Sequence, residues 1–245
     1  MKKFRQYRPF APLANNMKIG GLQKFSLIDY PDKVACVVFT QGCNFRCPYC
    51  HNPELVKPEM FLESLNEEEF FDFLKERKGK LDAVVITGGE PTLQYDLIEF
   101  IKKIRDLGFL IKLDTNGSNP GMLKEIIDQK LVNYVAMDIK APLDKYESIA
   151  GTKTDIKKIK QSIELIKNSG IDYEFRTTVV KNMLSPKDLK QIGEEIKGAK
   201  KYFLQKFISS KAVDEKMLNE TTYTDEEFKE LEKQLNKLVA KCLSR

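Results

Sequence analysis

Residues 34–53 read VACVVFTQGCNFRCPYCHNP and combine the clearest strand of the sequence with its most distinctive cysteine pattern. The apolar, β-branched run from Val34 to Phe39 predicts a buried strand. Gln41 and Gly42 then predict a turn. Three cysteines follow within eight residues of that turn. The stretch therefore predicts a metal site at the carboxyl end of a strand.

The three cysteines of this stretch, Cys43, Cys47 and Cys50, are spaced C-x3-C-x2-C. Soft thiolate ligands favour iron–sulfur clusters, copper(I) or zinc. Three thiolates leave one coordination position without a protein thiolate, which suits a cluster whose fourth iron binds a small molecule. The alternative is a structural zinc site with His51 as its fourth ligand. Because His51 directly follows Cys50, both side chains would then have to turn inward from adjacent positions.

Outside this stretch the sequence repeats a strand followed by a helix. Strands are expected at residues 34–39, 83–86, 110–113, 134–137, 173–180 and 202–205. The helices after them are expected at 66–75, 94–107, 121–129 and 155–169, then from a cap at Ser185 and from about Thr224. The first is expected to start with a capping box from Ser64 to Glu67. Six such units predict an α/β fold with a parallel sheet and outer helices, an open partial (β/α)6 barrel. Ligands of such folds bind at the carboxyl ends of the strands.

Three regions are expected to be irregular. Residues 20–31 are expected to approach the first strand without forming one, and residues 141–154 to be the longest irregular link, a candidate docking surface. Cys242 is expected in a charged C-terminal tail, and Cys36 in the apolar core of the first strand. These two cysteines form no second motif, so one cluster at most is expected.

The cysteine loop resembles that of the radical S-adenosylmethionine (SAM) enzymes, which share C-x3-C-x-aromatic-C, with Tyr49 as the aromatic residue. Within that superfamily, three segments resemble the activating proteins of anaerobic ribonucleoside-triphosphate reductases, which belong to the glycyl-radical-enzyme activases. The segments are residues 18–31 (KIGGLQKFSLIDYP), 39–43 (FTQGC) and 50–53 (CHNP). The resemblance extends from about Met17 onward and implies the partial TIM-like barrel of the radical SAM type.

The resemblance also implies the chemistry. Cys43, Cys47 and Cys50 would hold one 4Fe-4S cluster, whose remaining iron chelates SAM through its amino and carboxylate groups. An electron from flavodoxin or ferredoxin would cleave SAM to methionine and a 5'-deoxyadenosyl radical. That radical would take hydrogen from a glycine of a partner, expected to be the large subunit of anaerobic ribonucleotide reductase. No residue is expected to act as a general acid or base.

Two motifs at strand ends supply candidate SAM ligands. Gly88, Gly89 and Glu90 follow the second strand, and the resemblance implies that they hold the amino group of SAM. Taken alone, this motif is more typical of a plain strand-to-helix turn, and it is the cluster motif at the previous strand that favours a role in binding SAM. Asp114 ends the third strand, where a carboxylate can accept ribose hydroxyls or help to bind a cation. The Thr-Asn-Gly sequence after it is typical of an ordinary turn.

The remaining candidates come from later strands and from the cysteine loop. Period-two alternation puts Asp138 and Lys140 on one face of the fourth strand, where the resemblance implies SAM binding and the alternative is a local ion pair. Arg176 in the fifth strand is a further candidate, whereas Gln205 is assigned no role. The resemblance implies that Tyr49 and His51 lie along SAM, where they either contact its adenine side or support the residues that bind it. A turn-stabilising role is the alternative for His51.

Composition sets the remaining expectations. The 41 Lys and Arg residues exceed the 36 Asp and Glu residues by only five, too few to indicate nucleic acid as a partner. No apolar run approaches the roughly 18 residues of a membrane span. An odd number of cysteines without a secretory segment predicts a cytoplasmic protein. Residues 1–17 are expected to form an N-terminal extension and residues 18–245 a single radical SAM domain.

Three other functions remain open from the sequence. The chain can be an activase of another glycyl radical enzyme, of the pyruvate formate-lyase type. It can be a radical SAM enzyme that acts on a small molecule. The last alternative is a zinc-binding interaction module without catalytic activity.

Overall fold

The computed structural model describes residues 17–210 and 212–245, which form one eight-stranded sheet in the order β1 to β8. Strand β1 pairs antiparallel with β2, and every later neighbouring pair is parallel. The strands are Ile19–Ser26 (β1), Ala35–Thr40 (β2), Ala83–Gly88 (β3), Leu110–Thr115 (β4), Tyr134–Asp138 (β5), Asp172–Val179 (β6), Tyr202–Lys206 (β7) and Cys242–Ser244 (β8). Because β1 and β8 are the two edges of the sheet, the barrel is open between them.

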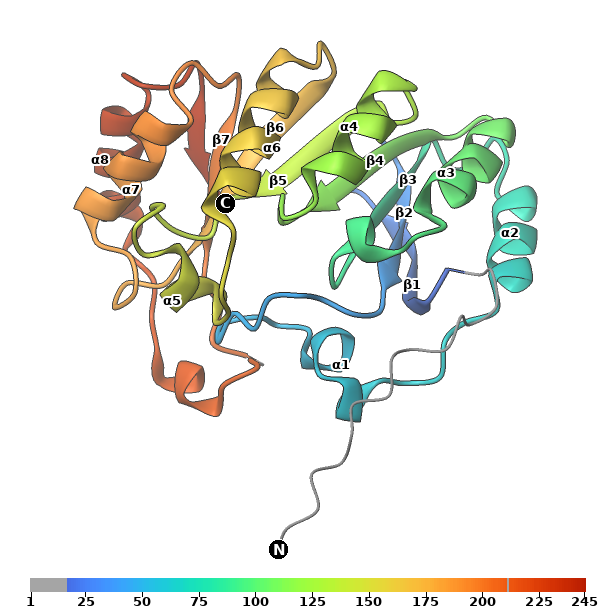
Figure 1. Ribbon diagram of the computed structural model, residues 1–245, viewed down its shortest axis with the longest axis horizontal. Coiled ribbons are helices and arrows are strands. Elements are labelled where there is room, and N and C mark those ends of the chain that lie inside the picture. Colours follow the sequence, from blue (N-terminus) through green and yellow to red (C-terminus); the bar gives the residue numbers. More distant parts are fainter. Residues whose placement is uncertain (1–16, 211) are drawn as a thin grey trace, which may run out of the picture.

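The helices cover the outer face of the curved sheet, except for the short α1 and α5, which lie below the sheet in Figure 1. They are Pro53–Val56 (α1), Glu67–Glu76 (α2), Leu97–Asp106 (α3), Pro120–Asp128 (α4), Tyr146–Ala150 (α5), Ile156–Asn168 (α6), Pro186–Glu195 (α7) and Asp225–Leu235 (α8). Short 3-10 helices lie at Pro58–Met60, Pro91–Leu93 and Glu215–Asn219. The predicted partial (β/α)6 barrel is therefore confirmed for β2 to β7 and their helices.

Alternate residues of the parallel strands enter two separate apolar cores. On the outer face, residues such as Val84 and Ile86 share one large cluster with helix residues such as Ile101. On the inner face a smaller cluster contains Val37 and Tyr134. Its members lie toward the amino ends of the strands, so the inner face near the carboxyl ends is left to polar side chains.

Two strands of the sheet were not predicted. The segment expected to approach the first strand irregularly forms β1, in which Gly20 and Gly21 and an exposed stretch of side chains hide the alternation typical of a strand. Cys242 is fully buried in β8 rather than lying in a tail, and three residues are too few for a detectable pattern. The link at 141–154 is also not wholly irregular, because it contains α5.

The helices begin within one residue of the predicted starts, except that α3, expected from residue 94, begins at Leu97. The capping box predicted from Ser64 to Glu67 is wrong, because Asn66 caps the helix by accepting a hydrogen bond from the backbone N–H of Glu68 at 2.8 Å. The Ser64 hydroxyl donates to the Ile19 carbonyl instead, at 3.0 Å. At α7 the predicted cap at Ser185 is confirmed.

The predicted N-terminal extension, residues 1–17, lies outside the described residues apart from Met17. This residue is 2% exposed, and its backbone N–H donates to the Glu67 carboxylate at 3.1 Å.

No helix in the described part of the chain has the length and apolar character that crossing a bilayer requires.

Candidate active site

A cavity of about 310 Å³ lies at the carboxyl ends of the parallel strands. The residues predicted to hold the cluster or SAM come from the loop after β2 and from β3 to β6 or the turns after them. All of them line this cavity: Cys43, Cys47, Tyr49, Cys50, His51, Gly88, Gly89, Glu90, Asp114, Asp138, Lys140 and Arg176. The fold therefore brings together residues that are far apart in the sequence, while their individual roles as ligands stay predictions.

The cysteine loop leaves β2 through a sharp turn at Gly42, whose φ of 96° favours glycine. The backbone N–H of Gly42 donates to the Leu55 carbonyl at 2.8 Å, and that of Cys50 donates to the Cys47 carbonyl at 3.1 Å. Cys43, Cys47 and Cys50 are all free thiols. Three free thiols on one ordered loop, facing one cavity, are a donor set that fits an iron–sulfur cluster.

Two of the thiols, those of Cys43 and Cys47, lie in an environment that disfavours their charged form. Burial raises the pKa of Cys43 to about 12 and also raises that of Cys47, while the nearby Lys140 ammonium opposes the rise at both. A coordinating metal ion supplies the positive charge that makes such thiols lose their protons. Lys140 would add to this stabilisation of the thiolates.

The His51 ring contacts the loop after β7. Its Nε2 lies 2.7 Å from the Ile208 carbonyl oxygen, and its ring stacks on Phe207 at 5.3 Å between centroids. Facing a carbonyl, Nε2 must donate a hydrogen, so in the neutral ring only Nδ1 keeps a lone pair for a metal ion. Within residues 17–210 and 212–245, no three His, Cys, Asp or Glu side chains are arranged to hold one metal ion.

Tyr49 offers the cavity an unused polar group. Its side chain is 4% exposed, and its hydroxyl is buried without a hydrogen-bond partner in the described part of the chain. Buried hydroxyls are normally paired. A bound group with a polar atom at this wall would satisfy it.

The two glycines of the Gly-Gly-Glu motif allow the turn after β3 to touch the start of the cysteine loop. A Cβ on Gly88, whose φ is 118°, would lie 2.3 Å from the Thr40 nitrogen. A Cβ on Gly89 would lie 2.1 Å from the Gly42 carbonyl oxygen, an oxygen that accepts the Glu90 N–H at 2.8 Å. Any side chain at either position would push the two turns apart.

Glu90 is fully buried, and four protein donors contact its carboxylate. Oε1 accepts from the Thr92 N–H at 3.0 Å, the Thr92 hydroxyl at 2.5 Å and the Thr115 hydroxyl at 2.7 Å. Oε2 accepts from the Asn116 N–H at 2.6 Å. Burial raises the pKa of Glu90, and these hydrogen bonds oppose that rise. Glu90 thus fixes the turn after β4, and its direct contact with SAM stays a prediction.

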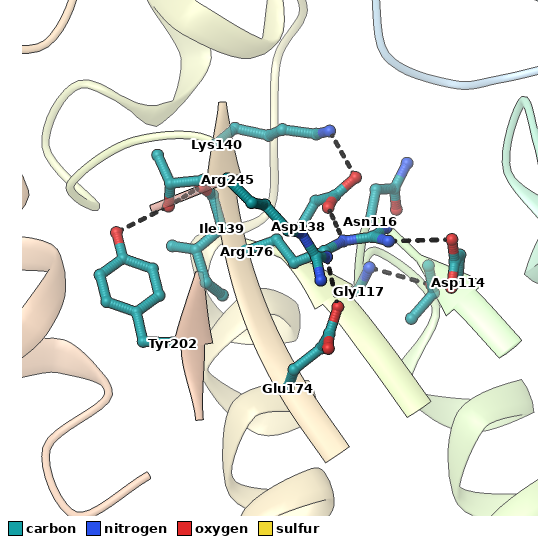
Figure 2. A network of polar contacts seen from close by, with 12 residues as sticks. Asp114, Asn116, Gly117, Asp138, Ile139, Lys140, Glu174, Arg176, Tyr202 and Arg245 are labelled. Atoms are coloured by element: carbon teal, nitrogen blue, oxygen red, sulfur yellow. Dashed lines mark hydrogen bonds and ion pairs between the residues drawn. The ribbon is translucent and has the colours of Figure 1, made fainter. Parts of the chain in front are cut away.

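Five charged side chains form a chain of ion pairs centred on Arg176. Figure 2 labels Asp114, Asp138, Lys140 and Arg176 of this chain. The Arg176 Nε donates to Asp138 at 2.8 Å and one terminal nitrogen donates to Asp114 at 3.0 Å. Lys140 pairs with Asp138 at 3.0 Å, and Lys112 pairs with Asp114 at 2.7 Å. The local ion pair considered for Asp138 and Lys140 is therefore present. Lys140 and Arg176 also line the cavity, where cationic side chains can pair with the carboxylate of a ligand.

These ion pairs keep Asp114, Asp138 and Arg176 ionised. Burial acts to raise the pKa of Asp138, but the Arg176 guanidinium and the Lys140 ammonium hold it well below its usual range. The pKa of Asp114 is lowered too, because Arg176 and Lys112 outweigh its burial. The two carboxylates in turn outweigh burial at Arg176 and raise its pKa.

Two residues that contribute to this site, Lys112 and Asn116, were not identified from the sequence. Lys112 is 2% exposed in the middle of β4, and its place on the same face as Asp114 was a detectable signal. Asn116 lines the cavity, although it had been interpreted as part of an ordinary turn. Gln205, which had no assigned role, also lines the cavity.

Comparison with known proteins agrees with this geometry. Residues 37–209 match the family model of the radical SAM superfamily. A putative glycyl-radical enzyme activating enzyme of Methanocaldococcus jannaschii is 36% identical over 235 residues, which are 93% of this chain and 95% of that protein. This chain belongs to the radical SAM superfamily, and within it to the glycyl-radical enzyme activating enzymes. Membership implies a 4Fe-4S cluster and SAM as cofactors, which favours the cluster over the zinc alternative.

Two further comparisons place this radical SAM chain more broadly. The pyruvate formate-lyase-activating enzyme of Clostridium pasteurianum is 30% identical over 182 residues, which are 70% of this chain and 72% of that enzyme. Among solved structures, Streptococcus suis SuiB bound to its precursor peptide SuiA has a TM-score of 0.66 at 12% identity. The match covers 85% of this chain but only 48% of SuiB, and it shows the fold alone.

Proposed function

We propose that this protein is an activase that uses SAM to generate a glycyl radical on a partner enzyme, namely the large subunit of an anaerobic ribonucleotide reductase. The convergence on one cavity of three free thiols and an ion-pair chain that contains Lys140 and Arg176 carries the proposal. When bound, the cluster and SAM supply the radical chemistry: reductive cleavage to methionine and a 5'-deoxyadenosyl radical that abstracts hydrogen from a glycine.

The chain's own residues would bind and orient the cofactors. Cys43, Cys47 and Cys50 would hold the iron. The Lys140 ammonium and the Arg176 guanidinium, which line the cavity, would pair with the carboxylate of SAM. Because cations hold the Asp114 and Asp138 carboxylates, neither is poised to accept a proton. This agrees with a mechanism that needs no general acid or base.

Two observations bear on the partner. Residues 18–31, 39–43 and 50–53 are similar to the activating proteins of anaerobic ribonucleotide reductases, which supports that partner. The similarity to the Clostridium enzyme supports a pyruvate formate-lyase type of partner as the second candidate. In both cases we expect reduced flavodoxin or ferredoxin to supply the electron.

Anaerobic incubation with each candidate partner tests the proposal. The reduced, reconstituted protein is mixed with SAM and either the ribonucleotide reductase large subunit or pyruvate formate-lyase, and the radical is detected by electron paramagnetic resonance. We expect a glycyl radical on the reductase, and a matched reductase whose radical-bearing glycine is changed to alanine should give none. A radical formed on pyruvate formate-lyase alone would assign the second partner. A radical on neither, with a small molecule consumed instead, would contradict an activase function.

A further inference from the structure

The turn after β4 reaches the cysteine loop through the side chain of Asn116. Its Nδ2 lies 3.9 Å from the Cys43 sulfur and 2.9 Å from the Asn44 side-chain oxygen. The backbone N–H of Phe45 also donates to the Cys43 sulfur, at 3.4 Å. Cys43 thus has one donor from its own loop and a second donor from the turn after β4.

Neighbouring groups fix the position of Asn116, which is 5% exposed. Its backbone N–H donates to the buried Glu90 carboxylate at 2.6 Å. Its side-chain oxygen accepts from the Ser118 N–H at 2.9 Å, a bond that only the oxygen can make. The amide nitrogen is therefore the end that faces Cys43, and the orientation follows from the hydrogen bonds around it.

The donor has a predictable effect on a thiolate that holds iron. Hydrogen bonds to the sulfurs of an iron–sulfur cluster are among the features that set its reduction potential. An N–H directed at sulfur stabilises negative charge there, and the reduced cluster carries one more negative charge than the oxidised one. Reduction therefore becomes easier when the donor is present.

We propose that Asn116 is a positioning residue of the cluster site, whose side-chain amide donates to the Cys43 thiolate and raises the reduction potential of the cluster. The inference rests on the proposed function, because it requires a cluster on Cys43. In this arrangement Glu90 of the Gly-Gly-Glu motif also holds in place the turn that contains Asn116. The motif, the turn after β4 and the cysteine loop then act as one unit.

Two substitutions at Asn116 and one control test this inference. Asn116→Leu keeps a similar shape without a donor, and Asn116→Asp keeps the oxygen for Ser118 but directs a carboxylate oxygen at the sulfur. Ser118→Ala removes the hydroxyl that accepts from Asn44 at 2.9 Å, so it loosens the same turn and leaves the Asn116 amide in place. The midpoint potential of each reconstituted protein is measured by a redox titration followed by electron paramagnetic resonance, with iron and sulfide determined on the same samples.

We expect the potential to become more negative in Asn116→Leu and more negative still in Asn116→Asp, with Ser118→Ala unchanged from wild type. An Asn116→Leu potential equal to that of wild type would overturn the inference and leave the proposed function intact. If both Asn116 variants failed to bind iron while Ser118→Ala bound it, Asn116 would be needed for assembly, and its redox role would be refuted. A wild-type protein without a cluster would overturn the proposed function itself.

Discussion

On the β2–β3 side of the cavity the wall consists of two backbone turns in close contact, whereas on the β4–β6 side it consists of ion-paired side chains. The first wall depends on Gly88 and Gly89, where no Cβ fits. The second depends on Arg176, which joins two carboxylates. We therefore expect the first wall to be sensitive to added atoms and the second to lost charge.

The cysteine loop itself provides the largest expected effect. Cys47→Ala removes one of the three thiols, and we expect it to abolish SAM cleavage because an incomplete ligand set does not retain the cluster. Production of 5'-deoxyadenosine by anaerobically reconstituted protein measures this. Cys36→Ala is the control, since Cys36 is buried in β2 and is not among the cavity residues. Full turnover in Cys47→Ala would refute its assignment as a ligand.

The backbone wall is tested by Gly89→Ala. The new Cβ would lie 2.1 Å from the Gly42 carbonyl oxygen, and two backbone segments must separate to admit it. We expect a loss of about 3 kcal/mol in the free energy of unfolding and weaker SAM binding. The matched control is Gly121→Ala in α4, where the nearest atom would lie at 3.7 Å. Equal stability of the two variants in urea denaturation would show that the turns are not in close contact.

The ion-paired wall is tested by Asp138→Asn. Lys140 and Arg176 lose the charge that they share, and we expect a loss of about 2 kcal/mol in stability, because the partly buried bonds to a charged acceptor are weakened. We also expect SAM to bind less tightly, since the two cations are no longer held in place. Asp72→Asn, in an exposed ion pair with Lys75, is the control and should change neither property. Unchanged SAM affinity in Asp138→Asn would separate this wall from cofactor binding.

The smallest expected effect is a pH dependence of the difference in stability between wild type and Asp138→Asn. The folded protein lowers the pKa of Asp138 below its ordinary value of 3.8. Its contribution to stability is therefore complete above that value and is lost as the pH falls below it. The stability difference between wild type and Asp138→Asn should be constant from about pH 7 to pH 5 and shrink toward about pH 2. Denaturant titrations across this range measure it, and a difference that grows in acid would contradict the sign of the shift.

The same two walls show how far the sequence could predict the structure. The parallel strands were predictable because strands buried on both faces are continuous apolar runs, as from Val34 to Phe39. Residues at the strand ends could be assigned to one site because the carboxyl ends of parallel strands meet at one edge. The cavity therefore contains every residue that the motifs indicated.

The pairings within the site could not be predicted, since they depend on register and on turn geometry. Arg176 meets Asp138 because the two residues are register partners between β5 and β6. Asn116 reaches Cys43 only because Glu90 holds the turn that carries it. The edge strand β1 was missed because Gly20 and Gly21 and the exposed residues after them weaken its pattern.

The central claim is that Cys43, Cys47 and Cys50 hold a four-iron cluster with one iron open to SAM. Electron paramagnetic resonance of the anaerobically reconstituted, reduced protein, with and without SAM, tests it most directly when the same sample is assayed for 5'-deoxyadenosine. The account predicts a reduced-cluster signal that changes when SAM is added, together with the nucleoside product. No iron–sulfur signal, or a signal indifferent to SAM, would contradict it and return the three cysteines to a structural role.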